Sequence, residues 1–159
     1  MRQLLLAGFL IVSLTASQAA VVRLAPEFAF PGPGKTQSLK SLRGQPVVLL
    51  IAKKPQSRAF RKQLKYLKEI YQQFASKQVV FIAALGEGAG PVKSDIPFVV
   101  ASNGPAVVTA YGVQDDFTLV IIGKDGNVDY QTSKVCTPER VRDVIQNSFE
   151  VQELSRKGQ

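Results

Sequence analysis

Hydrophobic residues form two uninterrupted runs, at residues 47–52 and 79–85, with an amphipathic segment between them. Neither run alternates with polar residues, which is typical of parallel strands covered on both faces. In the segment between them, apolar side chains spaced by three or four residues form one helical stripe: Phe60, Leu64, Leu67, Ile70, Tyr71 and Phe74. Ser57 is a suitable N-cap for this helix. The pattern predicts a βαβ unit with a right-handed crossover.

Connecting segments without helical or strand periodicity surround this unit. Residues 25–33 are predicted to form an extended lead-in, 36–44 a turn-rich connector and 86–91 a flexible loop. A short strand is expected at 98–100, followed by a helical turn over 105–111 that opens on a proline. No internal repeat or low-complexity segment is visible.

A hairpin and a last helix complete the pattern. Strands are predicted at 118–122 and 128–131, joined by an Asp-Gly turn at 124–126. Thr137 is a suitable N-cap for the last helix, and the polar tail after Glu150 is predicted to fray. The apolar face of this helix comprises Val141, Val144, Ile145 and Phe149. This order of elements predicts an α/β fold, a mixed sheet with helices on both faces.

The N-terminus has the three parts of a secretory signal peptide. Arg2 supplies a positive region, residues 4–14 an apolar region and Ser17-Gln-Ala19 a cleavage site. The apolar run is shorter than the roughly 20 residues that span a membrane. We therefore expect cleavage before Ala20 and a periplasmic or secreted product, with a retained signal anchor as the alternative. The 159 residues divide into a signal peptide at 1–19, one domain at 20–150 and a polar tail at 151–159.

The amino-acid composition limits the kinds of catalytic and metal-binding site that the chain can form. Histidine is absent, which removes the commonest general base and metal ligand, and Cys136 is the single cysteine, so no intramolecular disulfide can form. No cofactor or metal is predicted. The formal net charge is +8, with 20 lysines and arginines against 12 acids. For an exported protein this charge favours an acidic protein or an anionic envelope component as partner, and nothing indicates specific nucleic-acid binding.

Four short motifs occur in a familiar order: Ala25-Pro-Glu-Phe28, Leu39-Lys-Ser-Leu-Arg-Gly44, Ser102-Asn-Gly-Pro105 and Thr118-Leu-Val-Ile-Ile-Gly-Lys-Asp-Gly126. Together they resemble the thioredoxin superfamily, specifically its peroxiredoxin branch of alkyl hydroperoxide reductases and thiol-specific antioxidant proteins. The resemblance implies a thioredoxin-like three-layer domain, a mixed central sheet flanked by helices. The segments 122–126 and 145–156 also resemble a family of small exported bacterial proteins of unknown function.

The sequence differs from the peroxiredoxin branch at the position of that branch's active site. The family's cysteines would lie between Lys53 and Phe60, and neither a Cys-x-x-Cys motif nor a peroxidatic cysteine is present. Phe117 stands where the superfamily has a cis-proline, and a trans bond is expected because a cis non-proline bond costs about 2.5–4 kcal/mol. We therefore predict a non-catalytic binding or interaction protein of the bacterial envelope.

A basic cluster replaces the missing cysteines. The candidate anion-binding or partner-binding residues are Lys53, Lys54, Ser57, Arg58 and Arg61, and the cations continue through Lys62, Lys65 and Lys68. Acids, not bases, suit a helix N-terminus, so a bound anion would relieve the conflict between these cations and the helix dipole. The alternative is a solvated face whose lysine stems cover apolar surface.

Three interpretations of Cys136 remain open: a small buried hydrophobe, a thiol that is free or paired between chains, and a redox-active residue beside a helix N-terminus. The last would make the protein a divergent thiol oxidoreductase or peroxidase. A purely structural envelope protein is a further possibility. Gly32-Pro-Gly-Lys-Thr36 lacks the context of a phosphate loop and is predicted to be a turn, and Asp115-Asp116 a turn or solvated edge.

Overall fold

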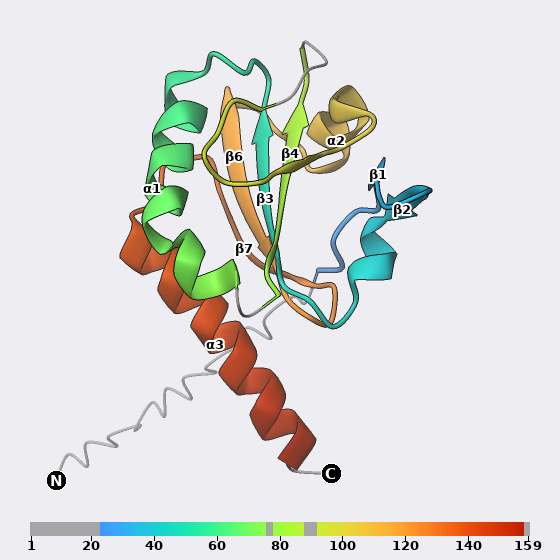
Figure 1. Ribbon diagram of the computed structural model, residues 1–159, viewed down its shortest axis with the longest axis vertical. Coiled ribbons are helices and arrows are strands. Elements are labelled where there is room, and N and C mark those ends of the chain that lie inside the picture. Colours follow the sequence, from blue (N-terminus) through green and yellow to red (C-terminus); the bar gives the residue numbers. More distant parts are fainter. Residues whose placement is uncertain (1–22, 76–77, 88–91, 158–159) are drawn as a thin grey trace, which may run out of the picture.

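A mixed five-stranded sheet forms the centre of the molecule in the computed structural model, which describes residues 23–75, 78–87 and 92–157 (Figure 1). Its strands, in spatial order, are β5 (Val99–Val100), β4 (Val80–Leu85), β3 (Val47–Ala52), β6 (Phe117–Ile122) and β7 (Val128–Thr132). β3 pairs in parallel with β4 and antiparallel with β6. The signal peptide predicted at 1–19 lies outside the described residues.

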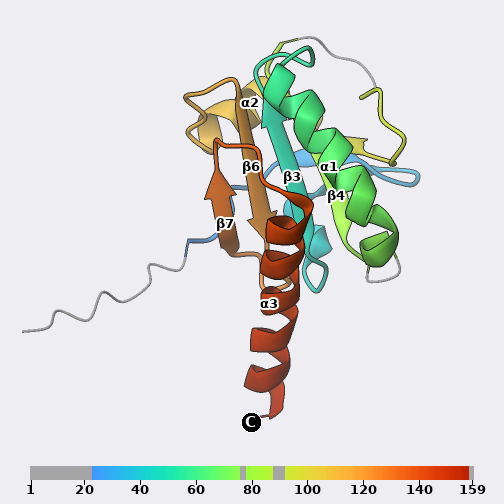
Figure 2. The same cartoon turned by 90° about the vertical axis from the view of Figure 1, so that its left-hand side faces the viewer.

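Three helices cover the two faces of the sheet: α1 (Arg58–Ala75), α2 (Gly104–Ala110) and α3 (Pro138–Lys157). All side chains of β3 and β6 are buried, as the uninterrupted apolar runs predict. Val48 and Leu50 belong to the core beneath α1 and α3, whereas Leu49 and Ile51 belong to the core beneath α2. Figure 2 shows α1 and α3 on one side of the sheet. The predicted three-layer α/β fold is therefore confirmed.

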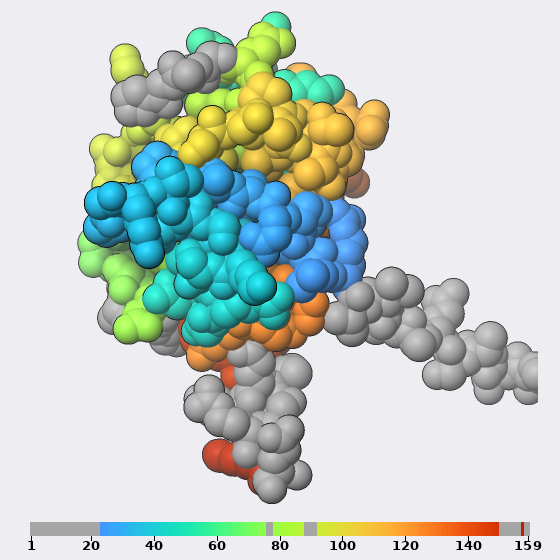
Figure 3. Space-filling model, turned by 90° about the vertical axis from the view of Figure 1, so that its right-hand side faces the viewer, coloured from blue at the N-terminus to red at the C-terminus, as the bar shows by residue number. Residues whose placement is uncertain are grey.

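The N-terminal connectors contain more regular structure than predicted. β1 (Ala29–Pro31) and β2 (Thr36–Ser38) form a small antiparallel hairpin, followed by a 3-10 helix, η1 (Leu39–Leu42). The predicted turn at 32–36 is the loop of this hairpin, in which Gly34 has a φ of 72°. Figure 3 shows these segments beside α2 on the second face of the sheet.

Two helix ends differ from the prediction. α2 begins at Gly104 rather than Pro105, because the Asn103 side chain accepts from the Ala106 N–H at 3.1 Å and caps the helix. α3 does not end after Glu150 but continues to Lys157, and it extends well beyond the sheet (Figure 2). The prediction that the chain frays after Glu150 is therefore wrong for residues 151–157. Of the loop predicted at 86–91, the structure describes only 86 and 87.

Candidate functional site

The end of β3 is tied by its backbone to the loops on both sides. The Lys53 N–H donates to the carbonyl of Asp116, just before β6, at 3.0 Å. Just after β4, the Glu87 N–H donates to the Lys53 carbonyl at 2.7 Å. The chain then turns into α1, with the Ser57 N–H donating to the Lys54 carbonyl at 3.1 Å. This junction lies at the carboxyl ends of two parallel strands, where open α/β sheets commonly bind ligands.

All five predicted site residues lie in this turn or in the first turns of α1, and we call them the junction site: Lys53, Lys54, Ser57, Arg58 and Arg61. Ser57 caps the helix as predicted, because its Oγ accepts from the Phe60 N–H at 3.4 Å. Lys53 is half-buried and its Nζ donates to the Gln114 carbonyl. The other three cations are exposed, so they face solvent around the start of the helix.

Acids from other loops oppose part of this charge. Glu87 Oε2 lies 3.6 Å from Lys54 Nζ, and Asp95 pairs with Lys68 farther along α1. The side chains of Lys54 and Glu87 are 63% and 67% exposed, so the pair contributes little to stability. The basic cluster is therefore less isolated in the folded protein than in the sequence, which has no acid between residues 53 and 68.

A groove lies beside α1, between the helix and the segment 92–95; we call it the α1 groove. It consists of two hollows of about 360 and 510 Å³, which share Arg61, Leu64 and Lys93 in their linings. The smaller hollow reaches the junction at Pro55, and the larger one continues along the helix. No pattern in residues 92–95 indicates that this segment lies against α1, so its contribution to the groove could not be predicted from the sequence.

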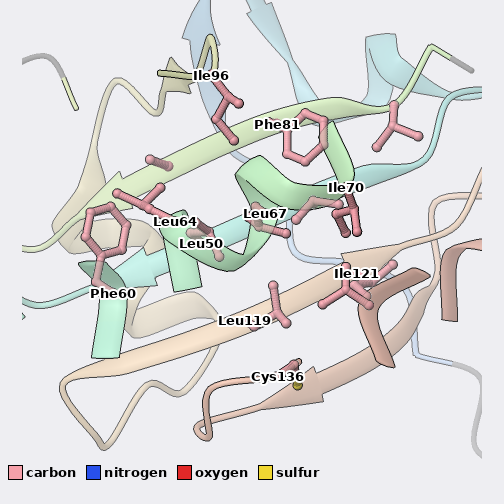
Figure 4. Packing of buried hydrophobic residues seen from close by; sticks show 14 of the residues in the cluster. Leu50, Phe60, Leu64, Leu67, Ile70, Phe81, Ile96, Leu119, Ile121 and Cys136 are labelled. Carbon is pink, nitrogen blue, oxygen red and sulfur yellow. The ribbon is translucent and has the colours of Figure 1, made fainter. Parts of the chain in front are cut away.

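Cys136 is buried, at 7% exposure, in the core beneath α1 and α3 (Figure 4). Its Sγ lies 3.6 Å from the Tyr130 hydroxyl. Its backbone pairs with the fully buried Gln63 of α1, whose Oε1 accepts from the Cys136 N–H at 2.8 Å and whose Nε2 donates to the Cys136 carbonyl at 3.1 Å. The structure thus matches the buried interpretation of Cys136, and Gln63 fixes the connector between β7 and α3.

A further hollow of about 330 Å³ lies between the β6–β7 hairpin and α3. Asp129 and Ser148 line it, and the Arg140 guanidinium stacks 5.1 Å from the centre of the Tyr130 ring. Desolvation by the surrounding chain raises the pKa of Asp129, although its side chain keeps contact with solvent; the nearby Ser148 hydroxyl opposes this rise, and the nearby Asp125 adds to it.

The described residues contain neither a metal-binding cluster nor a membrane-spanning helix. They contain no group of three or more His, Cys, Asp or Glu side chains arranged to hold a metal ion. No helix within the described ranges is both long and apolar enough to cross a membrane. All peptide bonds between described residues are trans, including the bond before Phe117, as predicted.

Most of the chain matches one known protein family. Residues 21–131 match the AhpC/TSA family, which is well over half of the chain. The chain belongs to the AhpC/TSA family. The peroxiredoxin-like resemblance is therefore confirmed. The AhpC/TSA match contains no cysteine, because Cys136 lies beyond its end.

Solved structures of thioredoxin-like proteins share the fold of this AhpC/TSA domain. A Chlorobium tepidum protein described as a DsbE-type thiol:disulfide interchange protein is 20% identical, with a TM-score of 0.66 over 80% of this chain and 96% of that one. Peroxidoxin BcpB of Mycobacterium tuberculosis is 15% identical, with a TM-score of 0.59 over 82% and 96%. An exposed lipoprotein thioredoxin of Streptococcus pneumoniae is 17% identical, with a TM-score of 0.58 over 77% and 99%. None of the curated proteins matches this sequence.

Proposed function

We propose that this protein is an exported, non-catalytic member of the AhpC/TSA family that binds an acidic protein or an anionic envelope component through the junction site. The observation that carries the proposal is that basic residues occupy the position where the family has its active-site cysteines. The turn between β3 and α1 is held by backbone hydrogen bonds to neighbouring loops, but Lys53, Lys54 and, at the first position of α1, Arg58 stand there and no thiol is present.

The electrostatics of the helix start support this function. α1 has no acid in its first turn, so Arg58 and the cations before it lie close to the positive end of the helix dipole. An anion bound there would interact favourably with both the dipole and the cations. Glu87 pairs with only one of these cations, through an exposed contact that a ligand carboxylate can replace.

A thiol enzyme that works through Cys136 is the competing function, and the geometry disfavours it. A catalytic thiol must reach its substrate, whereas Cys136 is buried in the core and its backbone is held by Gln63. Its contacts within hydrogen-bonding range are the Tyr130 hydroxyl and the Lys134 carbonyl. Neither group is a base that would activate a thiol at neutral pH.

The export half of the proposal rests on the signal-peptide pattern at residues 1–19. N-terminal sequencing of the protein recovered outside the cytoplasm tests it, and we expect the first residue to be Ala20 or a close neighbour. Recovery of the chain from a membrane fraction with Met1 intact would instead identify a retained signal anchor.

Binding at the junction site is tested with labelled polyglutamate by fluorescence anisotropy. The triple variant Lys54→Glu, Arg58→Glu and Arg61→Glu is compared with a matched control that reverses three exposed lysines elsewhere: Lys35, Lys40 and Lys134. We expect the first variant to weaken binding about tenfold more than the control, since three exposed charge pairs at roughly 0.2–1 kcal/mol each contribute about 0.6–3 kcal/mol. Binding should also weaken as salt rises.

The same variants separate a binding defect from a folding defect. Placing acids at the start of α1 should leave the unfolding midpoint unchanged or raise it slightly, because acids suit a helix N-terminus. Equal loss of binding in both triple variants would show that general basicity, not the junction site, attracts the polyanion.

A further inference from the structure

The floor of the α1 groove is apolar. Phe60 and Leu64 lie one helical turn apart on the same face of α1 and are 1% and 8% exposed. Val92, from the opposite wall, is half-buried and packs against the same hydrophobic cluster. A ligand side chain that enters the groove would therefore exchange water for an apolar surface, which is favourable only if that side chain is itself apolar.

The rim of the α1 groove is basic. Four exposed cations line it, from the helix and from the opposite wall: Arg61, Lys65, Lys68 and Lys93. Among the described residues of the lining Asp95 is the one acid, and it pairs with Lys68 through an ion pair whose side chains are 60% and 70% exposed. The groove therefore combines an apolar floor with an excess of positive charge on its rim.

We propose that the α1 groove binds an extended acidic peptide segment that carries apolar side chains, presented by a partner protein. This inference rests on the function proposed above and specifies its ligand. A small anion would engage the rim but leave the floor in water, and an uncharged apolar ligand would engage the floor but not the rim. An acidic segment with apolar side chains is complementary to both. The smaller hollow reaches Pro55, so such a segment runs from the junction site along α1.

The test uses two labelled peptides with the same eight glutamates, one carrying two leucines and the other two serines in the same positions. We expect the leucine peptide to bind about five to ten times more tightly, as partial burial of one leucine side chain predicts. Val92→Ser should reduce this preference and leave the affinity for the serine peptide unchanged, because Val92 contributes apolar surface and no charge. Fluorescence anisotropy measures all four affinities.

Charge reversal on the rim tests whether the basic side chains of the groove bind the acidic residues of the peptide. The double variant Lys65→Glu and Lys93→Glu should weaken binding of both peptides more than the control Lys40→Glu and Lys134→Glu. These substitutions are all at exposed positions, so unfolding curves should show intact folds.

The possible outcomes separate this inference from the function on which it rests. Equal affinity for the two peptides, or rim reversal no worse than the control, would overturn the peptide groove. If reversal of Lys54 and Arg58 still weakened polyglutamate binding, the junction site would stand without the groove; if it did not, both proposals would fall. Vesicles containing phosphatidylglycerol that bound more tightly than the leucine peptide, with the same loss on rim reversal, would assign the groove to lipid headgroups and overturn the peptide.

Discussion

Replacing Gln63 with methionine should destabilise the protein strongly. Gln63 is 0% exposed, and its amide makes both hydrogen bonds to the Cys136 backbone, at 2.8 and 3.1 Å. Methionine fills a similar volume, so packing changes little, but the N–H and carbonyl of Cys136 lose their partner in a site closed to water. An unsatisfied buried polar group costs about 1–3 kcal/mol, so we expect a loss of roughly 2–5 kcal/mol in the free energy of unfolding.

Denaturant unfolding followed by circular dichroism measures this loss, and Gln72→Met, at an exposed position of the same helix, is the matched control with an expected change below about 0.5 kcal/mol. A second measurement follows the reaction of Cys136 with a thiol reagent under native conditions. The rate should rise in Gln63→Met, because the connector that buries the thiol opens more often. A Gln63→Met protein as stable as the control variant would refute the reasoning.

Three further predictions concern other parts of the fold. Gly104→Ala should destabilise by more than about 3 kcal/mol or prevent folding, because an added Cβ would lie 1.7 Å from the Leu85 carbonyl oxygen; Ala106→Gly, exposed in the same helix, should cost only about 1 kcal/mol in unfolding assays. Asp129→Asn should be more stable than wild type at pH 7, since the raised pKa of Asp129 disfavours its charged form in the fold; in unfolding curves the difference should vanish as the pH falls below the unfolded pKa, about 3.9. Peroxide-reduction and insulin-reduction assays should show no turnover above background and no change in Cys136→Ser; activity lost in that variant would establish the enzyme function instead.

The sheet and its helices could be predicted because their signals are local. The apolar run at 47–52 matches β3 residue for residue, and Ser57 marks the start of α1. The end of α3 could not be predicted, because the sequence gives no local signal for it. No glycine or proline occurs between Pro138 and Gly158, so the sequence contains no stop signal at Glu150, and a polar composition alone does not end a helix.

The candidate site depends on contacts that no local pattern encodes. Glu87 and Asp95 approach the basic cluster from loops that follow it in the chain, and the Cys136 backbone lies 73 residues from Gln63. One signal was nevertheless present: Gln63 falls between Phe60 and Leu64 in the apolar stripe of α1, at a position that faces the core. A polar residue in such a stripe predicts a buried hydrogen bond, although not its partner.

The backbone bonds around Lys53 have a consequence for substitutions at this position. They join main-chain atoms of three loops, after β3, after β4 and before β6, and make no demand on the side chain at the junction. A different side chain at this position, a nucleophile or a cation, would therefore leave these backbone bonds in place. In this architecture the backbone geometry of the junction does not depend on whether a nucleophile stands there.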